Sequence, residues 1–83
     1  MNIFVAKLNY ATSEDALRAA FEEYGSVDSA KIIMDRETQR SKGFGFVEMP
    51  DDSEANEAIA SLNESDLDGR AIVVKKANPK GGR

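Results

Sequence analysis

The stretch KGFGFVEM, residues 42–49, places two phenylalanines two positions apart, behind a lysine. In a β-strand, residues two apart point to the same face, so Phe44, Phe46 and Glu48 share one face and Val47 lies on the other. Exposed aromatic rings can stack on nucleic-acid bases, and lysine can contact a phosphate. The alternative is a buried pair, because aromatic residues at this spacing in one strand are more often core residues. The other strands decide between the two interpretations.

Four strand-like segments and two helix-like segments alternate along the chain. The residue types predict strands over 3–8, 27–34, 44–49 and 71–77, with a charged loop at 35–43 and turns at 63–70. Apolar residues at helical spacing predict a helix within 11–25, capped by Thr12 or Ser13, and a second helix that Asp51 caps with Glu54 three positions later. This β-α-β-β-α-β order predicts the α+β ferredoxin-like fold, a four-stranded antiparallel sheet with two helices packed on one face.

Alternate residues of the four strands form two sets of different character. One set is apolar and uncharged: Ile3, Val5, Ala30, Ile32, Val47, Met49, Ile72 and Val74. The other set mixes aromatic, polar and charged residues: Asn2, Phe4, Lys31, Phe44, Phe46, Glu48 and Lys75. Burial of the second set under the helices would place three charges in the core, which is unfavourable unless each is paired. We therefore predict that the three phenylalanines lie on the open face of the sheet.

The composition excludes several classes of function. The 83 residues include neither cysteine nor histidine, which removes disulfides, thiolate catalysis, the common zinc sites and the usual general base. We expect no enzymatic activity, no metal and no cofactor. No apolar run approaches the ~18 residues of a membrane span and no targeting signal is recognisable, so a cytoplasmic location is expected. The length predicts one domain over residues 1–78 and a short flexible tail at 79–83.

The net charge of −4 argues by itself against an anionic partner. However, eleven of the fifteen acidic residues fall in the two predicted helices and the turn at 63–69. The basic residues are expected on the open face, at its rim or in the tail: Lys31, Arg36, Arg40, Lys42, Lys75, Lys76, Lys80 and Arg83. The distribution of charge is therefore compatible with an anionic ligand on the open face.

These motifs resemble those of the RNA recognition motif family. KGFGFVEM resembles the octamer signature of the family, and IFVAKL, about 40 residues upstream, resembles its hexamer. The similarity extends over about residues 2–78 and is strongest to the small single-domain RNA-binding proteins of bacteria. It implies a post-transcriptional regulator or RNA chaperone that is a monomer and binds single-stranded RNA, with single-stranded DNA as a second ligand. It implies no membrane partner and no small-molecule substrate.

The resemblance also implies roles for individual residues. Phe4 and Phe46 would stack on bases, Phe44 would contact a sugar or base, and Lys42 would contact a phosphate. The remaining RNA-binding positions would lie at the margins of this aromatic surface or close over the bound RNA: Lys31, Ile33, Arg36, Arg40, Lys75, Lys76 and Asn78. Two roles are open for Glu48, which are repulsion of some bases and acceptance of a hydrogen bond from a base amino group.

Three positions depart from the family pattern. Met49 replaces the usual aromatic residue, but its parity predicts that it points into the core. Lys7 stands where asparagine is common and Ala6 where glycine is common, which leaves the contacts of the following loop open.

One alternative function is protein binding through the sheet or the helical face. The other is an acylphosphatase-like enzyme, which is disfavoured because KLNYATS, residues 7–13, contains no arginine and no glycine-rich anion cradle.

Overall fold

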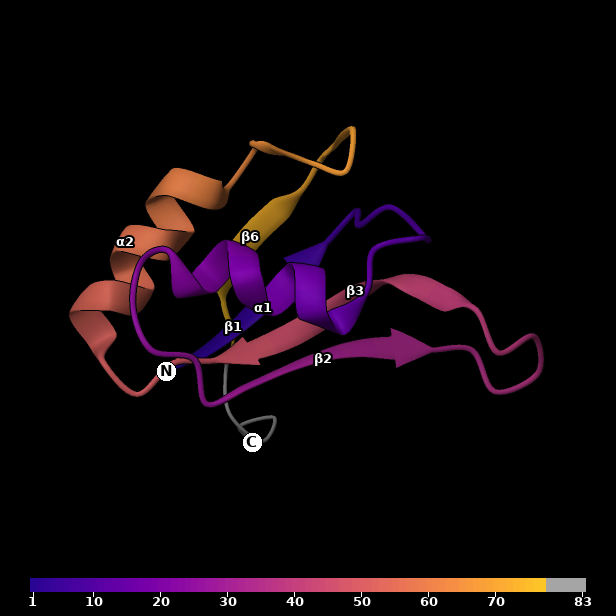
Figure 1. The fold of residues 1–83 in the computed structure, drawn as a ribbon, viewed down its shortest axis with the longest axis horizontal. Coiled ribbons are helices and arrows are strands. Elements are labelled where there is room, and N and C mark those ends of the chain that lie inside the picture. Colours follow the sequence, from indigo (N-terminus) through magenta and orange to yellow (C-terminus); the bar gives the residue numbers. More distant parts are fainter. Residues whose placement is uncertain (78–83) are drawn as a thin grey trace.

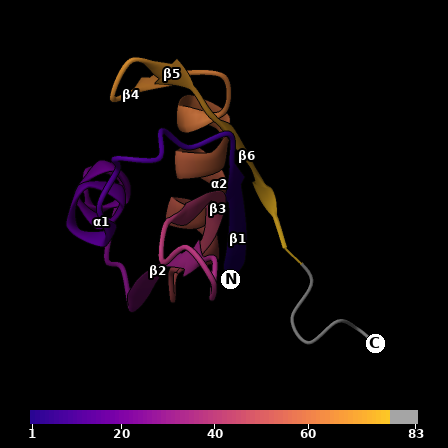
Figure 2. The ribbon, with the colours of Figure 1, turned by 90° about the vertical axis from the view of Figure 1, so that its right-hand side faces the viewer.

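The computed structural model, which describes residues 1–77, contains a four-stranded antiparallel sheet with two helices on one face (Figure 1). Its elements are β1 (Asn2–Ala6), α1 (Glu14–Glu22), β2 (Ser29–Met34), β3 (Ser41–Glu48), α2 (Asp52–Leu62), β4 (Asp66–Leu67), β5 (Arg70–Ala71) and β6 (Val73–Lys76). The strand order in the sheet is β2-β3-β1-β6. In Figure 2 the two helices lie to the left of β6, and no helix of residues 1–77 lies to its right. The predicted ferredoxin-like fold is confirmed.

Both helices begin at the capping residues that the sequence indicates. The Ser13 side chain accepts a hydrogen bond from the Ala16 N–H, and the Asp51 side chain accepts one from the Glu54 N–H. Each bond satisfies a backbone donor that has no partner within the helix. Thr12, the other candidate cap, is buried instead and donates its hydroxyl to Asp68. Neither helix of the described residues is long and apolar enough to cross a membrane.

The core lies between the helices and one face of the sheet. The sheet contributes fully buried residues from alternate strand positions, among them Ile3, Val5 and Val47, and the helices contribute Leu17 and Phe21 from α1 and the small residues Ala55 and Ala58 from α2. Met49 is also fully buried, as its parity predicts. The face that was predicted to be apolar is therefore the one that the helices cover.

Apart from shifts of one or two residues at the ends of β1 and β2, two segments differ from the sequence prediction. Strand β3 begins at Ser41 rather than at 44, because Ser41 pairs with Met34 after a bulge in β3, where residues 42–44 lie opposite Ile33, so the connecting loop is shorter than expected. The turn region at 63–70 and Ala71 contain a separate hairpin of β4 and β5, and the fourth strand of the large sheet begins at Val73. Figure 2 shows this hairpin above α2, away from the central strands.

Candidate nucleic-acid interface

Three aromatic rings form a cluster at the centre of the open face, on the two middle strands. We call Phe4, Phe44 and Phe46 the aromatic platform. Phe4 and Phe46 are direct cross-strand partners, and the Phe4 ring centroid lies 5.5 Å from that of Phe46 and 5.9 Å from that of Phe44. Tilted rings at these separations attract each other. Phe46 keeps 40% of its surface exposed, while Phe4 and Phe44 are half-buried. The platform is therefore held together by its own contacts and still presents ring surface to solvent.

Local sequence explains why the rings point outward. Phe4 lies between Ile3 and Val5, and Phe46 lies between Gly45 and Val47. All of these neighbours are buried on the helix-covered side. Because successive side chains of a strand alternate between faces, burial of the neighbours fixes the phenylalanines on the opposite face.

Lysines surround the platform. Lys75 is the cross-strand partner of Phe4, and its Nζ lies 5.7 Å from the centroid of that ring, within the range of a cation–π interaction. Lys31 is the partner of Phe46 on the other side. Lys42 precedes Phe44 by two positions in β3 and is exposed. A strand of nucleic acid that crossed the platform would meet a cation on each of these sides.

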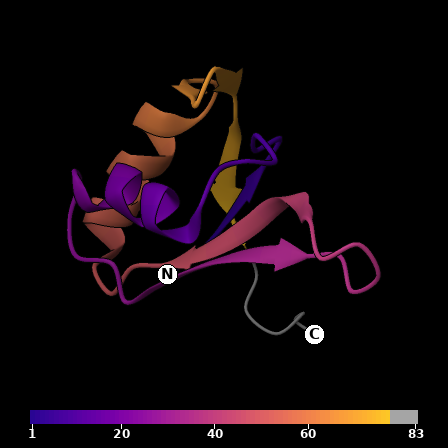
Figure 3. The same cartoon turned by 45° about the vertical axis from the view of Figure 1, so that its right-hand side comes forward.

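The loop between β2 and β3 carries Arg36 and Arg40, and Figures 1 and 3 show it extending beyond the rest of the molecule. Asp35 organises this loop, because its carboxylate accepts hydrogen bonds from the backbone N–H groups of Thr38 (3.1 Å) and Glu37 (2.8 Å). These hydrogen bonds hold the pKa of Asp35 below its ordinary value, and the bond from Thr38 has the largest effect. The positive charge of Lys42 lowers the pKa further. The carboxylate is therefore ionised at neutral pH, the form that accepts these two hydrogen bonds. Both arginines are exposed.

The remaining predicted residues of β2 and β3 lie at the margins of the platform. Ile33 is half-buried in β2, opposite the bulge in β3. Glu48 is exposed and is paired in register with Asn2 on one side and Ser29 on the other. The Ser29 hydroxyl donates to the Glu48 carboxylate at 3.3 Å. Sequence reasoning did not single out Ser29, although it shares its strand face with Lys31 and the alternation of β2 could have identified it.

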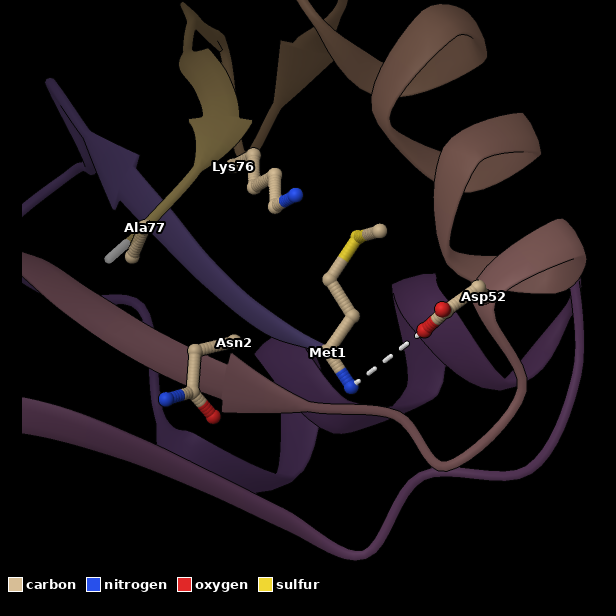
Figure 4. Close-up of a pocket in the computed structure, with 5 residues that line it drawn as sticks. All are labelled: Met1, Asn2, Asp52, Lys76 and Ala77. Atoms are coloured by element: carbon tan, nitrogen blue, oxygen red, sulfur yellow. Dashed lines mark ion pairs between the residues drawn. The ribbon is translucent and has the colours of Figure 1, made fainter. Parts of the chain in front are cut away.

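The structure does not bring Lys76 together with the platform. Lys76 pairs in register with Ile3, whose side chain is buried under the helices, whereas Lys75 pairs with Phe4. Figure 4 shows the Lys76 side chain extending toward the side on which α2 begins, in a pocket lined by Met1, Asn2, Asp52, Lys76 and Ala77. Asn78 and the predicted tail at 79–83 lie outside the described residues.

Two exposed apolar residues were not predicted as features of the surface. Tyr10 and Met34 expose 67% and 53% of their surface and line a second pocket beside the N-terminus of α1. Tyr10 lies close to Gly43 on the helix side of β3, so this pocket is separate from the platform. Within the described residues, no three His, Cys, Asp or Glu side chains are close enough together to hold a metal ion.

A model of the RNA recognition motif family matches residues 3–73 of this chain. Glycine-rich RNA-binding protein GRP1A of Sinapis alba is 50% identical over 78 residues, which are 94% of this chain and 47% of that protein. The RbpB protein of Nostoc sp. is 46% identical over 83 residues, which are 100% of this chain and 81% of RbpB. This chain thus spans about half the length of the glycine-rich relatives that it matches.

Solved structures agree with these matches. The crystal structure of RNA-binding protein PG1 is 49% identical, covers 93% of both chains and has a TM-score of 0.90. A structure of Sxl-lethal protein in complex with RNA is 33% identical, with a TM-score of 0.86 over 92% of this chain and 47% of that one. The resemblance that the two sequence motifs indicated is confirmed.

Proposed function

This chain belongs to the RNA recognition motif family, and from that membership we propose that it binds single-stranded RNA on the open face of its sheet. The observation that carries the proposal is the aromatic platform. Its three rings lie on the uncovered face, and Phe46 is the third most exposed of the large hydrophobic residues. Every base has a flat π-face that can stack on such a ring, so the platform suits a strand whose bases are not paired.

The proposal assigns a role to each residue around the platform. Phe4 and Phe46 stack on successive bases, and Phe44 contacts a base or the sugar between them. Lys42, Lys31 and Lys75 contact the backbone or the edges of the bases, Ile33 extends the platform along β2, and Arg36 and Arg40 contact the strand from the projecting loop. Lys76 is left out of this set, because its register position opposite Ile3 supports a place on the other side of the sheet edge.

The expected affinity is moderate. Two or three stacked bases at ~1–3 kcal/mol each, with two or three phosphate contacts, suggest a dissociation constant of about micromolar or weaker once ordering costs are included. Each phosphate contact contributes roughly −0.7 to the log–log salt slope on single strands, so a slope of about −1.5 to −2 is expected. The proposal includes non-enzymatic action as a regulator or chaperone of RNA, a monomeric state, a cytoplasmic location and weaker use of single-stranded DNA.

An NMR titration with a pool of short random RNAs tests the proposal. We expect chemical-shift changes at backbone amides of β1, β3, β2 and β6, with small changes on α1 and α2. Two double variants separate stacking from general apolar contact. Phe44→Ala/Phe46→Ala removes the rings and their apolar bulk, and Phe44→Leu/Phe46→Leu keeps the bulk but removes the π-face. Both should lose most of the affinity. Shifts confined to the helices, or wild-type binding by both double variants, would contradict the proposal.

A further inference from the structure

Three polar side chains cross the open face beside the aromatic platform. Asn2 on β1, Glu48 on β3 and Ser29 on β2 are aligned by the pairings Asn2↔Glu48 and Ser29↔Glu48. We call them the polar row. The row lies two residues along the strands from the row of Phe4, Phe46 and Lys31, which is about 7 Å at the rise of a β-strand. A base stacked on Phe46 is therefore close enough for one of its edges to reach the polar row.

The carboxylate of Glu48 has unused capacity to accept hydrogen bonds. One of its oxygens accepts the Ser29 hydroxyl at 3.3 Å, and this is its only side-chain hydrogen bond among residues 1–77. No cation of the described residues lies within ion-pair distance of it. An ionised carboxylate offers about four lone-pair sites and no donor. Glu48 is thus oriented from one side by Ser29 and still presents acceptors to a ligand on the open face.

The four bases differ in how well they satisfy such a group. On its Watson–Crick edge, guanine has two adjacent donors, N1–H and the N2 amino group, which match the two oxygens of a carboxylate. Adenine and cytosine have one amino donor beside a ring nitrogen that accepts. Uracil has one N3–H between two carbonyl oxygens, which the carboxylate would repel. These edges are free in single-stranded RNA, and hydrogen bonds to a charged acceptor are stronger than neutral ones.

We propose that Glu48, oriented by Ser29, selects guanine at the nucleotide that stacks on Phe46; this inference rests on the proposed function of the open face. Asn2 flanks Glu48 on the side away from Ser29. Its side-chain amide can donate a hydrogen bond to the guanine O6, which lies next to the two donors whose hydrogen bonds Glu48 accepts. The acid on the binding face is then a specificity-determining residue, and its repulsion of phosphate is limited because it lies beside the edge of the base rather than at the lysines.

The experiment uses four pentanucleotide RNAs that differ only at the central position, with uridine at the other four positions and G, A, C or U in the centre. Binding of the full chain is measured by fluorescence anisotropy. We expect the G-centred RNA to bind at least about fivefold more tightly than the U-centred one, the lower end of what a base contact through two hydrogen bonds supplies. Adenine and cytosine should fall between them.

Three variants identify the cause of the preference. Glu48→Gln replaces one acceptor by a donor, so G should lose its advantage over A, and the G-to-U ratio should fall to within about twofold. Ser29→Ala frees the carboxylate and should reduce the ratio in part. Glu57→Gln removes the same charge from an exposed position on α2 and should leave the ratio unchanged. This variant separates base selection from the general effect of one less negative charge.

The outcomes distinguish this inference from the proposed function. If all four RNAs shift the amides of the sheet but Glu48→Gln strengthens binding to each of them equally, Glu48 only repels RNA and the inference is wrong while the platform stands. The inference is also wrong if the wild-type chain binds the sheet without preferring G. If none of the four RNAs binds the sheet at millimolar concentration, the proposed function itself is overturned.

Discussion

The two faces of this sheet are made from alternate residues of the same strands, but their side chains have different surroundings. On the helix-covered face, Val5, Val47 and Val74 are at most 1% exposed, and none of the buried side chains there is charged. On the open face, Phe46 is 40% exposed and has Lys31 and Phe4 as cross-strand neighbours. Burial stabilises the fold on the first face, whereas ring surface stays available for a ligand on the second. Substitutions on the covered face should therefore change mainly the stability of the fold, and substitutions at alternate positions on the open face should change mainly RNA binding.

The largest expected effect concerns the covered face. Phe21 of α1 is fully buried against the sheet. Phe21→Ala should lower the free energy of unfolding by about 3–5 kcal/mol, because it removes a large apolar side chain and leaves a cavity. The total free energy of unfolding of a small domain is only about 5–15 kcal/mol. Urea denaturation followed by circular dichroism should show the midpoint moving to a much lower urea concentration. A midpoint like that of the wild-type protein would mean that the helix contributes little to the core.

Adjacent residues of β3 provide a direct comparison of the two faces. Val47→Ala should lower the free energy of unfolding by about 2 kcal/mol and leave the RNA dissociation constant within twofold, since its methyl groups touch only the core. Phe46→Ala should weaken RNA binding by roughly 5- to 150-fold, from one lost stacking contact of ~1–3 kcal/mol. Its effect on stability should stay below about 1 kcal/mol, the range of a cross-strand pair.

Urea denaturation and fluorescence anisotropy, both well below the melting temperature, measure the two properties on the same samples. The comparison fails if both variants lose stability and binding in the same proportion. That result would indicate that the rings of the platform stabilise the fold as much as core residues do.

The division between the faces could be predicted from sequence because two independent signals coincide. Strand alternation sorts the residues into two sets, and the charges of Lys31, Glu48 and Lys75 fall in only one of them. The helix caps could also be predicted, because Ser13 and Asp51 act on backbone groups three residues away. Local chemistry and parity were sufficient for the fold and for the centre of the site.

Features that depend on pairing between distant segments could not be predicted. The early start of β3 depends on a bulge that brings Met34 opposite Ser41, and the hairpin of β4 and β5 depends on pairing of Asp66 with Ala71. The side of the sheet on which Lys76 lies is an exception, because strand alternation already places it with Ile72 and Val74 and away from Lys75. Gly45 is required by a similar long-range contact, because a Cβ there would overlap the carbonyl oxygen of Lys31 in the next strand.

The two lysines at the end of β6 test the comparison at the edge of the sheet. Lys75 lies over the ring of Phe4, whereas Lys76 lies in the pocket with Asp52. Lys75→Ala should reduce the steepness of the log–log salt dependence of RNA binding by about 0.7, the share of one contact on a single strand. Lys76→Ala should leave it nearly unchanged. Dissociation constants at four or more salt concentrations measure both slopes. Equal changes would indicate that the bound strand passes around the edge of the sheet and contacts both lysines.

The smallest expected effect is at Lys7, where the chain leaves the sheet and passes from Ala6 on the open face to Leu8 in the core. Lys7 has a left-handed backbone with a φ of 61°, and the Leu8 N–H then donates to the Gly43 carbonyl at 2.8 Å. This backbone conformation costs roughly 1–2 kcal/mol for a residue with a Cβ, while glycine avoids the strain but loses about 0.5–1 kcal/mol through its greater freedom in the unfolded chain. Lys7→Gly should therefore raise the free energy of unfolding by about 0.5 kcal/mol, with RNA affinity within twofold of wild type.

Lys7→Ala is the control, because it removes the same charge but keeps the strain. Its free energy of unfolding, measured by urea denaturation, should not exceed that of the wild-type protein. If the alanine variant were stabilised as much as the glycine variant, the charge of Lys7 rather than its backbone would limit stability at this end of β1.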